Sequence, residues 1–335
     1  MTENPNVSVI IPAYNEESLI ANCLDSLLNQ DYQKDLYEII VVNDGSTDKT
    51  KNIVEKYTIK YSNLILINKS NGGKASAQNL GLKYAKGKYI LITDSDAIVE
   101  KQWISKMVND LAKYDLVIGS YYSKENHKLL EKIQNSHYLI KFKYGGLKGR
   151  PCIGVNNGFR KSVILRIGNF DESKTSVTDD FIKRAEKIGL KIYFNPSIIV
   201  LTKCTTNMRG FLKQKLRWNE SPLLCLKNRN ITFIDLLGLI YVGSLSLFLF
   251  ISLLLSLASF NPIYFMFSYL ITFIVIFLFY LQPFVKLCRS QDDSYAVFFI
   301  GYIFLEIVVR ILLIPYYIFL LIQPNKKPTF ESNRI

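Results

Sequence analysis

Cysteine and histidine are scarce in this 335-residue chain, which contains five Cys and two His. The cysteines are odd in number and form no CxxC pair or Cys/His cluster, which argues against a zinc site or a secreted disulfide framework and favours a reducing compartment. The first residues, MTENPNVSVII, lack a basic segment followed by an apolar core, so we expect no secretory signal. Because 49% of the residues are hydrophobic, the disordered and collagen-like classes are excluded as well.

One long stretch of the chain, residues 236–285, contains no Asp, Glu, Lys or Arg. One bilayer span needs about 20 apolar residues, so this stretch has the length of two spans. A third apolar run contains Glu306 and Arg310, which lie four residues apart and therefore on one helix face. These two charges either pair with each other or snorkel to the interface, or they mark a function within the membrane. Whether this third segment crosses the bilayer fully stays open. The spans are predicted near 234–258, 263–283 and 295–322.

The net charge of +13 is carried almost wholly by residues 1–230, whose own charge is +12. A basic part beside an apolar part suggests an anionic substrate or surface. Seven cations accompany one acid in residues 203–229, next to the first predicted span, so anionic lipid is a simpler partner than nucleic acid. The positive-inside rule then predicts a multi-pass protein of the cell membrane with residues 1–230 in the cytoplasm.

Three regions follow from these patterns of charge and hydropathy. We expect a cytoplasmic domain over residues 1–230 that ends in an amphipathic interfacial segment at about 205–230, a membrane domain over 231–323, and a polar tail over 324–335.

Short apolar runs alternate with helical patterns in the first part of the chain, which predicts an α/β fold whose mostly parallel sheet is covered on both faces. Polar motifs follow four of these runs, at Tyr14, Asp44, Gly72–Lys74 and Asp94–Asp96. Ligands bind beyond the carboxyl ends of strands in such sheets, so the four motifs predict one crevice and an enzyme. The expected strands are 7–11, 38–42, 64–67, 89–93 and 116–119.

Five motifs in this order resemble those of membrane-anchored family-2 glycosyltransferases: VSVIIPAYNEE, VVNDGSTD, NGGKASAQNLGLKYAKGKYILITDSDA, TDDF and QKLRW. The resemblance covers residues 7–218 and implies a GT-A catalytic domain, with a Rossmann-like sheet, followed by C-terminal transmembrane helices. It also implies inverting transfer of a sugar from a nucleotide diphosphate sugar, with Mg²⁺ or Mn²⁺ as cofactor. A UDP-sugar is the first expectation for the donor, and a GDP-sugar is the alternative.

Asp94-Ser95-Asp96 is predicted to supply the metal ligands and to bind the donor. Alternate residues of an extended segment point the same way, so both carboxylates can face one site. Hard oxygen ligands suit Mg²⁺ or Mn²⁺, which usually also bind substrate phosphates. By resemblance to the DxD motif, Asp96 is the more direct ligand and Asp94 lies nearer the donor sugar or ribose, whereas the alternative role is a polar turn and helix cap.

Further donor-binding residues are expected in the first three loops. By resemblance, Asp44 accepts a hydrogen bond from the nucleotide base and Tyr14 lies against that base, while Pro12 and Glu16 belong to the same donor loop. Lys74 follows two glycines at a predicted helix N-terminus, a place that attracts phosphate, and is expected to reach the diphosphate. An ordinary turn or a solvated lysine is the plainer explanation of each motif.

Thr178-Asp179-Asp180 resembles the family's Thr-acid-Asp motif, whose last member is the catalytic base. Asp180 would take the acceptor hydroxyl proton as that oxygen attacks the anomeric carbon, which requires hydrogen-bond reach. Asp179 is expected to bind the acceptor. The structural alternative is a helix cap whose acids favour the macrodipole.

The acceptor is also expected to meet residues of two further segments. In Gln214-Lys215-Leu216-Arg217-Trp218, which resembles QxxRW, Arg217 would contact the diphosphate, Trp218 would stack on the acceptor sugar, and Gln214 would support either. An amphipathic interfacial helix is the other reading of this segment. Asn157 and Gly158 are expected in an acceptor loop.

The expected reaction is transfer to a hydroxyl of a lipid-linked or polysaccharide acceptor at the cytoplasmic membrane face. A polyprenyl-phosphate sugar synthase and a processive polysaccharide synthase are alternatives of the same class. A non-catalytic, membrane-tethered nucleotide-sugar binding protein is an alternative of another class, and a nucleotidyltransferase is disfavoured because the first loop is acidic and lacks glycine.

Overall fold

The computed structural model describes residues 5–123, 128–143, 154–174, 177–215, 248–249, 251–290 and 294–322. The chain divides into two compact units. The sheet unit comprises residues 1–125 and 149–203, and the helical unit comprises residues 126–148 and 204–333. Within the described part of the chain, residues 128–143 and 204–215, which the sequence assigns to the first domain, cluster with the C-terminal helices.

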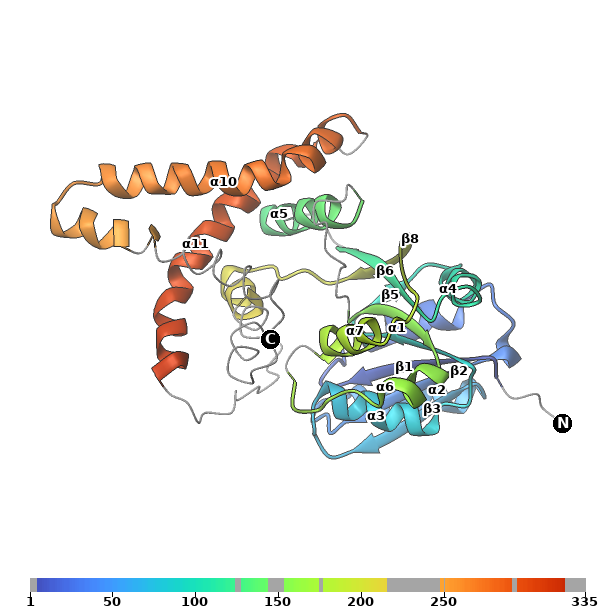
Figure 1. Ribbon diagram of the computed structural model, residues 1–335. Coiled ribbons are helices and arrows are strands. Elements are labelled where there is room, and N and C mark those ends of the chain that lie inside the picture. The colour runs from blue at the N-terminus through green and yellow to red at the C-terminus, as the bar shows by residue number, and fades with distance from the viewer. Residues whose placement is uncertain are drawn as a thin grey trace. The chain divides into compact units, whose positions relative to one another are not determined.

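The sheet unit is built on one eight-stranded sheet with the order β3-β2-β1-β4-β7-β6-β8-β5 (Figure 1). The pairs β1–β2, β2–β3, β1–β4 and β6–β8 are parallel, while β4–β7, β6–β7 and β5–β8 are antiparallel. The five predicted strands are all present, which confirms the α/β fold with a mostly parallel sheet. The strands are β1 (Val7–Ala13), β2 (Tyr37–Asp44), β3 (Leu64–Lys69), β4 (Tyr89–Thr93), β5 (Ile98–Val99), β6 (Leu116–Ser123), β7 (Asn156–Arg160) and β8 (Ile192–Thr202).

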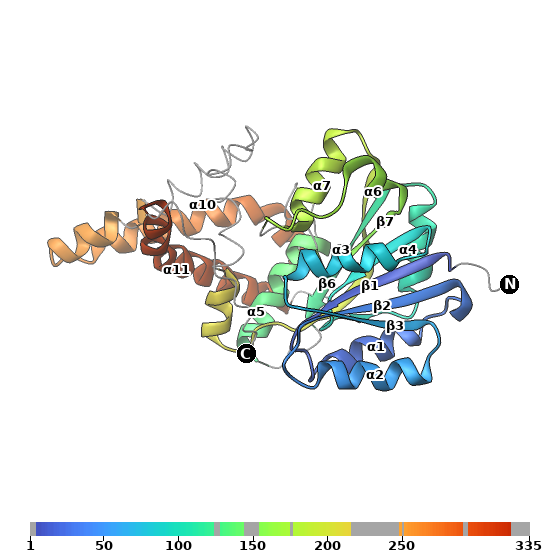
Figure 2. The ribbon, with the colours of Figure 1, turned by 90° about the horizontal axis from the view of Figure 1, so that it is seen from below.

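Helices cover both faces of this sheet, because its strands are apolar on both sides. Figure 2 shows α3 on one face and the helices α1 and α2 on the other. An ideal Cβ on Gly81 of α3 would lie 2.5 Å from Ile10 Cγ2 of β1, so glycine allows α3 to pack directly on the strands. The helices are α1 (Ile20–Leu28), η1 (Lys34–Leu36), α2 (Thr50–Lys60), α3 (Lys74–Tyr84), α4 (Trp103–Leu111), α6 (Ser162–Ile167) and α7 (Val177–Lys187).

Strand β7 corrects the expectation of an acceptor loop around Asn157 and Gly158, because these residues lie inside the sheet between β4 and β6. An ideal Cβ on Gly158 would lie 2.5 Å from Leu91 and 3.3 Å from Leu111 of α4, so this glycine faces the α4 side. Alternation along the strand places Asn157 on the opposite side, together with Phe159, whose ring lies 5.0 Å from that of Phe181 in α7. Only Asn157 therefore shares a sheet face with the Thr-Asp-Asp segment.

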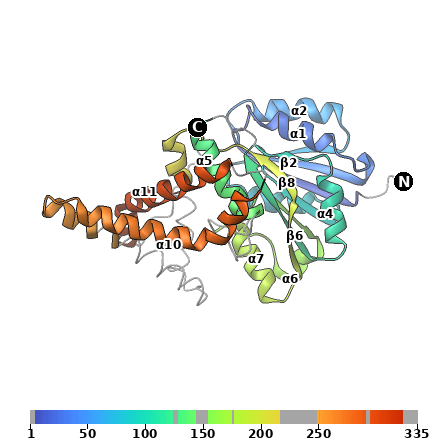
Figure 3. The same cartoon turned by 90° about the horizontal axis from the view of Figure 1, so that it is seen from above.

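The helical unit packs α11 against both α5 and α10 (Figure 3). Its apolar core includes Ile140, Leu287, Phe299, Ile303 and Ile307, all of them almost fully buried. The elements are α5 (Leu129–Tyr138), the π-helical turn η2 (Leu139–Lys143), short helices over 208–215 and 251–258, α10 (Ile263–Cys288) and α11 (Tyr295–Ile322).

Within the described ranges, no single helix is long and apolar enough to cross a bilayer, but the bent pair Ile263–Leu278 and Tyr280–Cys288 meets these criteria together, with 70° between its halves. Most of the predicted span 234–258 lies outside the described residues. The membrane crossings therefore stay predictions.

Candidate active site

The carboxyl ends of β1, β2, β3 and β4 bring the predicted donor loops to one edge of the sheet, where the chain order changes direction between β1 and β4. The loop after β1 is tied to the loop after β2 by backbone-to-side-chain hydrogen bonds. Asn15 N donates to Ser46 Oγ at 3.0 Å, and Glu16 N donates to Thr50 Oγ1 at 2.7 Å. Tyr14, which lies between Pro12 and these contacts in the sequence, is half-buried.

Asp44, the last residue of β2, organises the glycine turn that follows β3. Its Oδ1 accepts hydrogen bonds from Lys69 Nζ at 2.6 Å and from Gly72 N at 2.9 Å, and its Oδ2 accepts one from Gly73 N at 2.8 Å. Gly73 has a φ of 86°, in the left-handed region that favours glycine. The carboxylate thus fixes the start of α3, and an additional hydrogen bond to a nucleotide base stays a prediction.

Asp94 and Asp96 follow β4 and are both half-buried, while Ser95 between them is buried. Cys23 of α1 donates a hydrogen bond to Asp94 O at 3.5 Å. Burial, and then the negative charges of Asp96, Asp94 and Glu16, raise the pKa of the Cys23 thiol far above its ordinary range. Three predicted donor-site acids therefore lie within electrostatic reach of one buried thiol, which is inert as a nucleophile in this environment.

Lys74 connects the glycine turn to the DxD segment, because its Nζ donates to Asp94 Oδ1 at the beginning of α3. Gly154 lies beside this ion pair. An ideal Cβ on Gly154 would be 3.5 Å from Lys74 Nζ and 3.0 Å from Thr178 Oγ1. The Thr-Asp-Asp segment at the N-terminus of α7 is therefore next to the Lys74–Asp94 pair, as the sequence predicts for one shared crevice.

Both acids of the Thr-Asp-Asp segment form ion pairs along α7. Asp180 Oδ2 lies 2.8 Å from Arg184 Nε, and Asp179 Oδ2 lies 3.2 Å from Lys183 Nζ. Arg184 also donates to Ile167 O and, at 2.9 Å, to Asn169 O. Arg184 therefore holds the Asp180 carboxylate in a fixed direction and ties α7 to the end of α6.

The Asp94 and Asp96 pair fits a divalent cation of the Mg²⁺ or Mn²⁺ type. Among the described residues, no cluster of three or more His, Cys, Asp and Glu side chains forms that would hold an ion by itself. Such cations, however, usually combine one or two carboxylates with substrate phosphates and water, and both carboxylates here are hard oxygen donors. The site is therefore suited to a cation that arrives with a diphosphate.

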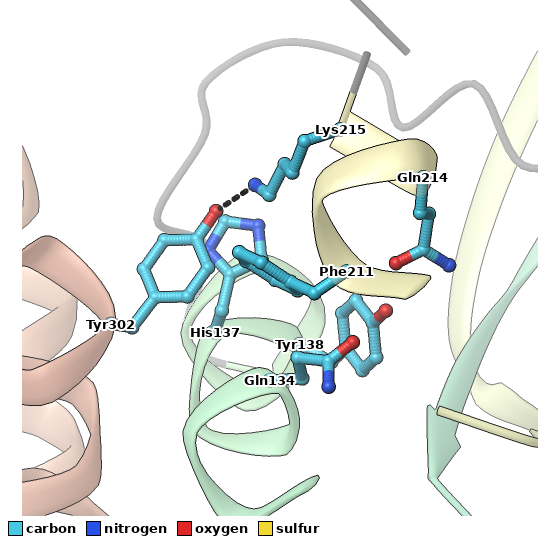
Figure 4. A pocket seen from close by; sticks show the side chains of 7 residues that line it. All are labelled: Gln134, His137, Tyr138, Phe211, Gln214, Lys215 and Tyr302. Carbon is cyan, nitrogen blue, oxygen red and sulfur yellow. Dashed lines mark hydrogen bonds between the residues drawn. The ribbon is translucent and has the colours of Figure 1, made fainter. Parts of the chain in front are cut away.

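The QxxRW segment begins in the helix 208–215 of the helical unit, and Arg217 and Trp218 lie outside the described residues. Gln214 lines a small cavity within that unit (Figure 4), and its Oε1 is buried without a hydrogen-bond partner among the described residues. Its neighbour Lys215 pairs with Glu306 at 2.6 Å. Glu306 is thus partnered by a residue far away in sequence, and the side chain of Arg310 lies outside the described part.

The motifs assign no role to three cations that form ion pairs in the structure, which are Lys69, Arg184 and Lys215. The spacing of Asp180 and Arg184, four apart on a predicted helix, was a usable signal for an ion pair. No comparable signal exists for Lys69 with Asp44 or Lys215 with Glu306, because their partners are distant in sequence.

Two family models match the chain. The model described as Glycosyl transferase family 2 matches residues 8–168, and the model described as Glycosyl transferase family group 2 matches residues 89–281. The chain is 31% identical over 233 residues to a probable glycosyltransferase, YdaM, of Bacillus subtilis (strain 168), in a match that covers 65% of this chain. That match covers 55% of YdaM, so the chain spans about half the length of this relative.

A second relative and one solved structure extend the comparison. The chain is 25% identical over 245 residues to the dolichyl N-acetyl-alpha-D-glucosaminyl phosphate 3-beta-D-2,3-diacetamido-2,3-dideoxy-beta-D-glucuronosyltransferase of Methanococcus voltae, covering 66% of this chain and 74% of that one. The fold is similar to that of the mannosyltransferase PcManGT from Pyrobaculum calidifontis in complex with GDP-Man and Mn²⁺, with a TM-score of 0.58, 19% identity, and coverage of 93% and 88% of the two chains. The chain therefore belongs to glycosyltransferase family 2, with the GT-A fold.

Proposed function

We propose that the protein transfers a sugar, with inversion, from a UDP-sugar or GDP-sugar to a hydroxyl of a lipid-linked or polysaccharide acceptor at the cytoplasmic face of the cell membrane. The observation that carries this proposal is the position of Gly154, where an ideal Cβ would lie 3.0 Å from Thr178 Oγ1 and 3.5 Å from Nζ of Lys74, the lysine that pairs with Asp94. A donor diphosphate at Lys74 would then have its sugar near the Thr-Asp-Asp segment. Both reacting groups would then meet at the same edge of the sheet unit.

Asp180 is the proposed general base. It would accept the proton of the acceptor hydroxyl as that oxygen attacks the anomeric carbon and the bond to the diphosphate breaks. Arg184 keeps the Asp180 carboxylate directed, through its 2.8 Å contact and its two bonds to the end of α6. Asp179 and Asn157 are the proposed acceptor contacts on the same face of the sheet.

The departing diphosphate carries the charge that the site must stabilise. Lys74, at the N-terminus of α3, is the proposed phosphate contact in the sheet unit, and Arg217 is the proposed contact from the QxxRW segment. Asp94 and Asp96 would hold Mg²⁺ or Mn²⁺, which when bound neutralises part of the phosphate charge. The presence of GDP-Man and Mn²⁺ in PcManGT supports such a donor and cofactor.

Membrane attachment and a lipid-linked acceptor are supported by the surface of the helical unit. Large apolar side chains of α10 are exposed, among them Met266 (66%), Phe267 (64%), Leu270 (53%) and Leu278 (58%). Exposed apolar residues in such a row indicate contact with lipid or another apolar partner. The name of the Methanococcus voltae relative, which includes a dolichyl-linked sugar phosphate, supports a lipid-linked acceptor.

The test is Asp180→Asn in the purified full-length protein in detergent, with labelled donors, Mn²⁺ and a membrane lipid extract. We expect transfer to fall at least about 100-fold, because general-base catalysis contributes about 10²- to 10⁴-fold, while nucleotide binding is kept. Glu186→Gln, on the exposed side of the same helix, is the matched control. Near-normal turnover of Asp180→Asn would refute the base assignment, and a wild-type protein that binds donor without turnover would leave only the non-catalytic alternative.

The length of the product decides between the remaining alternatives. One or a few sugars on a lipid acceptor supports the proposal, whereas long polymer from the single protein indicates a processive synthase. A product with the sugar joined directly to a polyprenyl phosphate would indicate a phosphate acceptor instead of a hydroxyl.

A further inference from the structure

One buried amide of α3 holds the chain segment that leads from α6 to α7. Asn79 Nδ2 donates to Phe170 O and to Glu172 Oε1, each at 2.9 Å, and Asn79 Oδ1 accepts a hydrogen bond from Phe170 N at 3.0 Å. Asn79 is 8% exposed, and these bonds use both amide hydrogens and the carbonyl oxygen of its side chain. Because Phe170 offers a backbone donor and a backbone acceptor, only a side chain that also has both groups can bind it in this way.

The side chain of Phe170 packs against the first turns of α7. Its ring lies 4.5 Å from that of Phe181, with 38° between the planes, and both residues are almost fully buried. Phe181 directly follows Asp180, the proposed base. The helices α3, α6 and α7 lie next to one another in Figure 1 and in Figure 2. The residue that Asn79 holds by its backbone therefore contacts, through its ring, the residue beside the proposed base.

Arg184 of α7 holds the same segment from the other side. The guanidinium group that pairs with Asp180 also donates to Ile167 O and Asn169 O. Residues 167–172, the bridging segment, are thus bonded to α3 on one side and to α7 on the other. The bridging segment joins the helix that begins with Lys74 to the helix that carries Asp180.

The beginning of α3 has anchors of its own. Asp44 accepts hydrogen bonds from the two backbone N–H groups that precede Lys74, and Lys74 pairs with Asp94. None of these contacts involves Asn79, which lies five residues further along α3, or about 7.5 Å along the helix axis. Loss of the Asn79 side chain should therefore displace α7 relative to α3 while the proposed donor residues keep their places.

We propose that Asn79 is a positioning residue for the transfer reaction: through the bridging segment it sets the place of Asp180 relative to Lys74. This inference rests on the proposed function, in which Lys74 contacts the donor diphosphate and Asp180 takes the acceptor proton. A misplacement of reacting groups by about 1 Å can cost about 100-fold in rate. The rate of transfer should therefore depend on Asn79 much more than the affinity for the nucleotide does.

Gln30 provides a matched control, because its amide has the same exposed fraction and the same number of hydrogen bonds. It is 8% exposed, and its Nε2 donates to Ser26 O at 3.0 Å and to Glu100 O at 2.9 Å. Its Oε1 accepts a hydrogen bond from Ile104 N at 3.0 Å. These bonds connect α1 to α4 and involve none of the proposed donor or acceptor residues.

The experiment compares Asn79→Ala with Gln30→Ala in the purified full-length protein, with labelled donors, Mn²⁺ and a membrane lipid extract. The readouts are the transfer rate at saturating donor, the Kd of UDP or GDP at saturating Mn²⁺, and the melting temperature. Each variant loses the three hydrogen bonds of one buried amide, so we expect similar decreases in melting temperature. Well below both melting temperatures, Asn79→Ala should lose about 10- to 100-fold in transfer rate and keep the wild-type nucleotide Kd. Gln30→Ala should keep both its transfer rate and its nucleotide Kd within about twofold of the wild type.

Three results would overturn the proposal. The first is an unchanged transfer rate in folded Asn79→Ala, and the second is an equal loss of rate in Gln30→Ala, which would make the effect one of general destabilisation. The third is a nucleotide Kd that rises as much as the rate falls, because Asn79 would then organise the donor loop instead.

Should Asn79→Ala fail to fold, Phe170→Leu tests the same connection, since it keeps the backbone bonds to Asn79 and weakens the ring contact with Phe181. Its transfer rate must fall about two- to tenfold, as expected from a weakened aromatic contact, and an unchanged rate overturns the proposal. A wild-type protein without transfer would refute the proposed function and this inference with it. An unchanged rate in the variants beside an active wild type refutes this inference alone.

Discussion

Replacement of Lys74 by methionine should have opposite effects on the two ligands of the site. In the free protein the Lys74 ammonium holds Asp94, one of the two carboxylates proposed for the divalent cation. When donor and cation bind, the cation can take the place of the ammonium at Asp94, and Lys74 becomes available to the diphosphate. Lys74→Met keeps most of the apolar stem and removes the charge, so it should strengthen Mn²⁺ binding to the free protein and weaken nucleotide binding.

The size of each effect follows from the exposure of the pair. The Lys74 and Asp94 side chains are 38% and 17% exposed, so the pair is a partly solvated one. Such pairs contribute about 0.2–1 kcal/mol, and loss of the competing cation should tighten Mn²⁺ binding up to about fivefold. Loss of a charge-assisted hydrogen bond to phosphate costs about 1.5–3 kcal/mol, which corresponds to about 10- to 150-fold weaker binding of the nucleotide.

Isothermal titration calorimetry measures both affinities, first with Mn²⁺ alone and then with UDP or GDP at saturating Mn²⁺. Lys83→Met, an exposed lysine on the same helix, is the matched control and should change neither affinity. Weaker binding of both ligands would refute the reasoning, because Lys74 would then organise the loop and not substitute for the cation. Unchanged binding of both would remove Lys74 from the site.

Three further predictions concern the sheet unit. Asp44→Asn loses one of its two carboxylate acceptors and its charge, so it should lower the unfolding free energy by about 2–4 kcal/mol and the melting temperature by about 5–15 °C; a shift under about 2 °C would contradict the hydrogen-bond assignment. Gly81→Ala brings a methyl group within 2.5 Å of Ile10, so urea unfolding should show a loss of about 1–3 kcal/mol, and any stabilisation would disprove this close contact. Burial, and then the hydrogen bond to Asp25, raise the pKa of Tyr57 to about 12, so the neutral phenol is favoured in the folded state. The contribution of this shift to stability is complete below about pH 10 and is lost as the pH rises through about 12. Tyr57→Phe should therefore abolish this decrease of the unfolding free energy with pH in the alkaline range. An identical decrease in both proteins would contradict the prediction.

The parallel half of the sheet was predictable because its strands are continuous apolar runs followed by turn residues. β2, for example, reads Tyr-Glu-Ile-Ile-Val-Val before Asn43 and Asp44, and it is buried along its whole length. A strand that is apolar on both faces must be covered by other elements on both sides. The apolar pattern therefore predicts the layered fold, and the end of each strand predicts the edge of the sheet at which the site lies.

Strand β7 was not predictable from such a pattern, because Asn-Asn-Gly-Phe-Arg contains poor strand formers and no alternation. Its place depends on contacts distant in sequence. The side chain of Asn156 accepts a hydrogen bond from Trp103 Nε1 at 2.9 Å and donates to Ser120 O and Ile198 O at 2.7 and 3.0 Å. A buried amide is stable there only because three partners satisfy it, and no local propensity contains that information.

The cations that pair with the motif acids explain how the proposed anionic donor can approach an edge of the sheet that carries several carboxylates. A diphosphate would be repelled by a cluster of unpaired acids, and the repulsion would be strong in a partly buried site of low dielectric constant. In the described structure, three of the acids at this edge each contact one cation, so their fields are largely cancelled before any ligand arrives. The basic excess of residues 1–230 then attracts the donor at longer range. The pairs that achieve this cancellation are Asp44 with Lys69, Asp94 with Lys74 and Asp180 with Arg184.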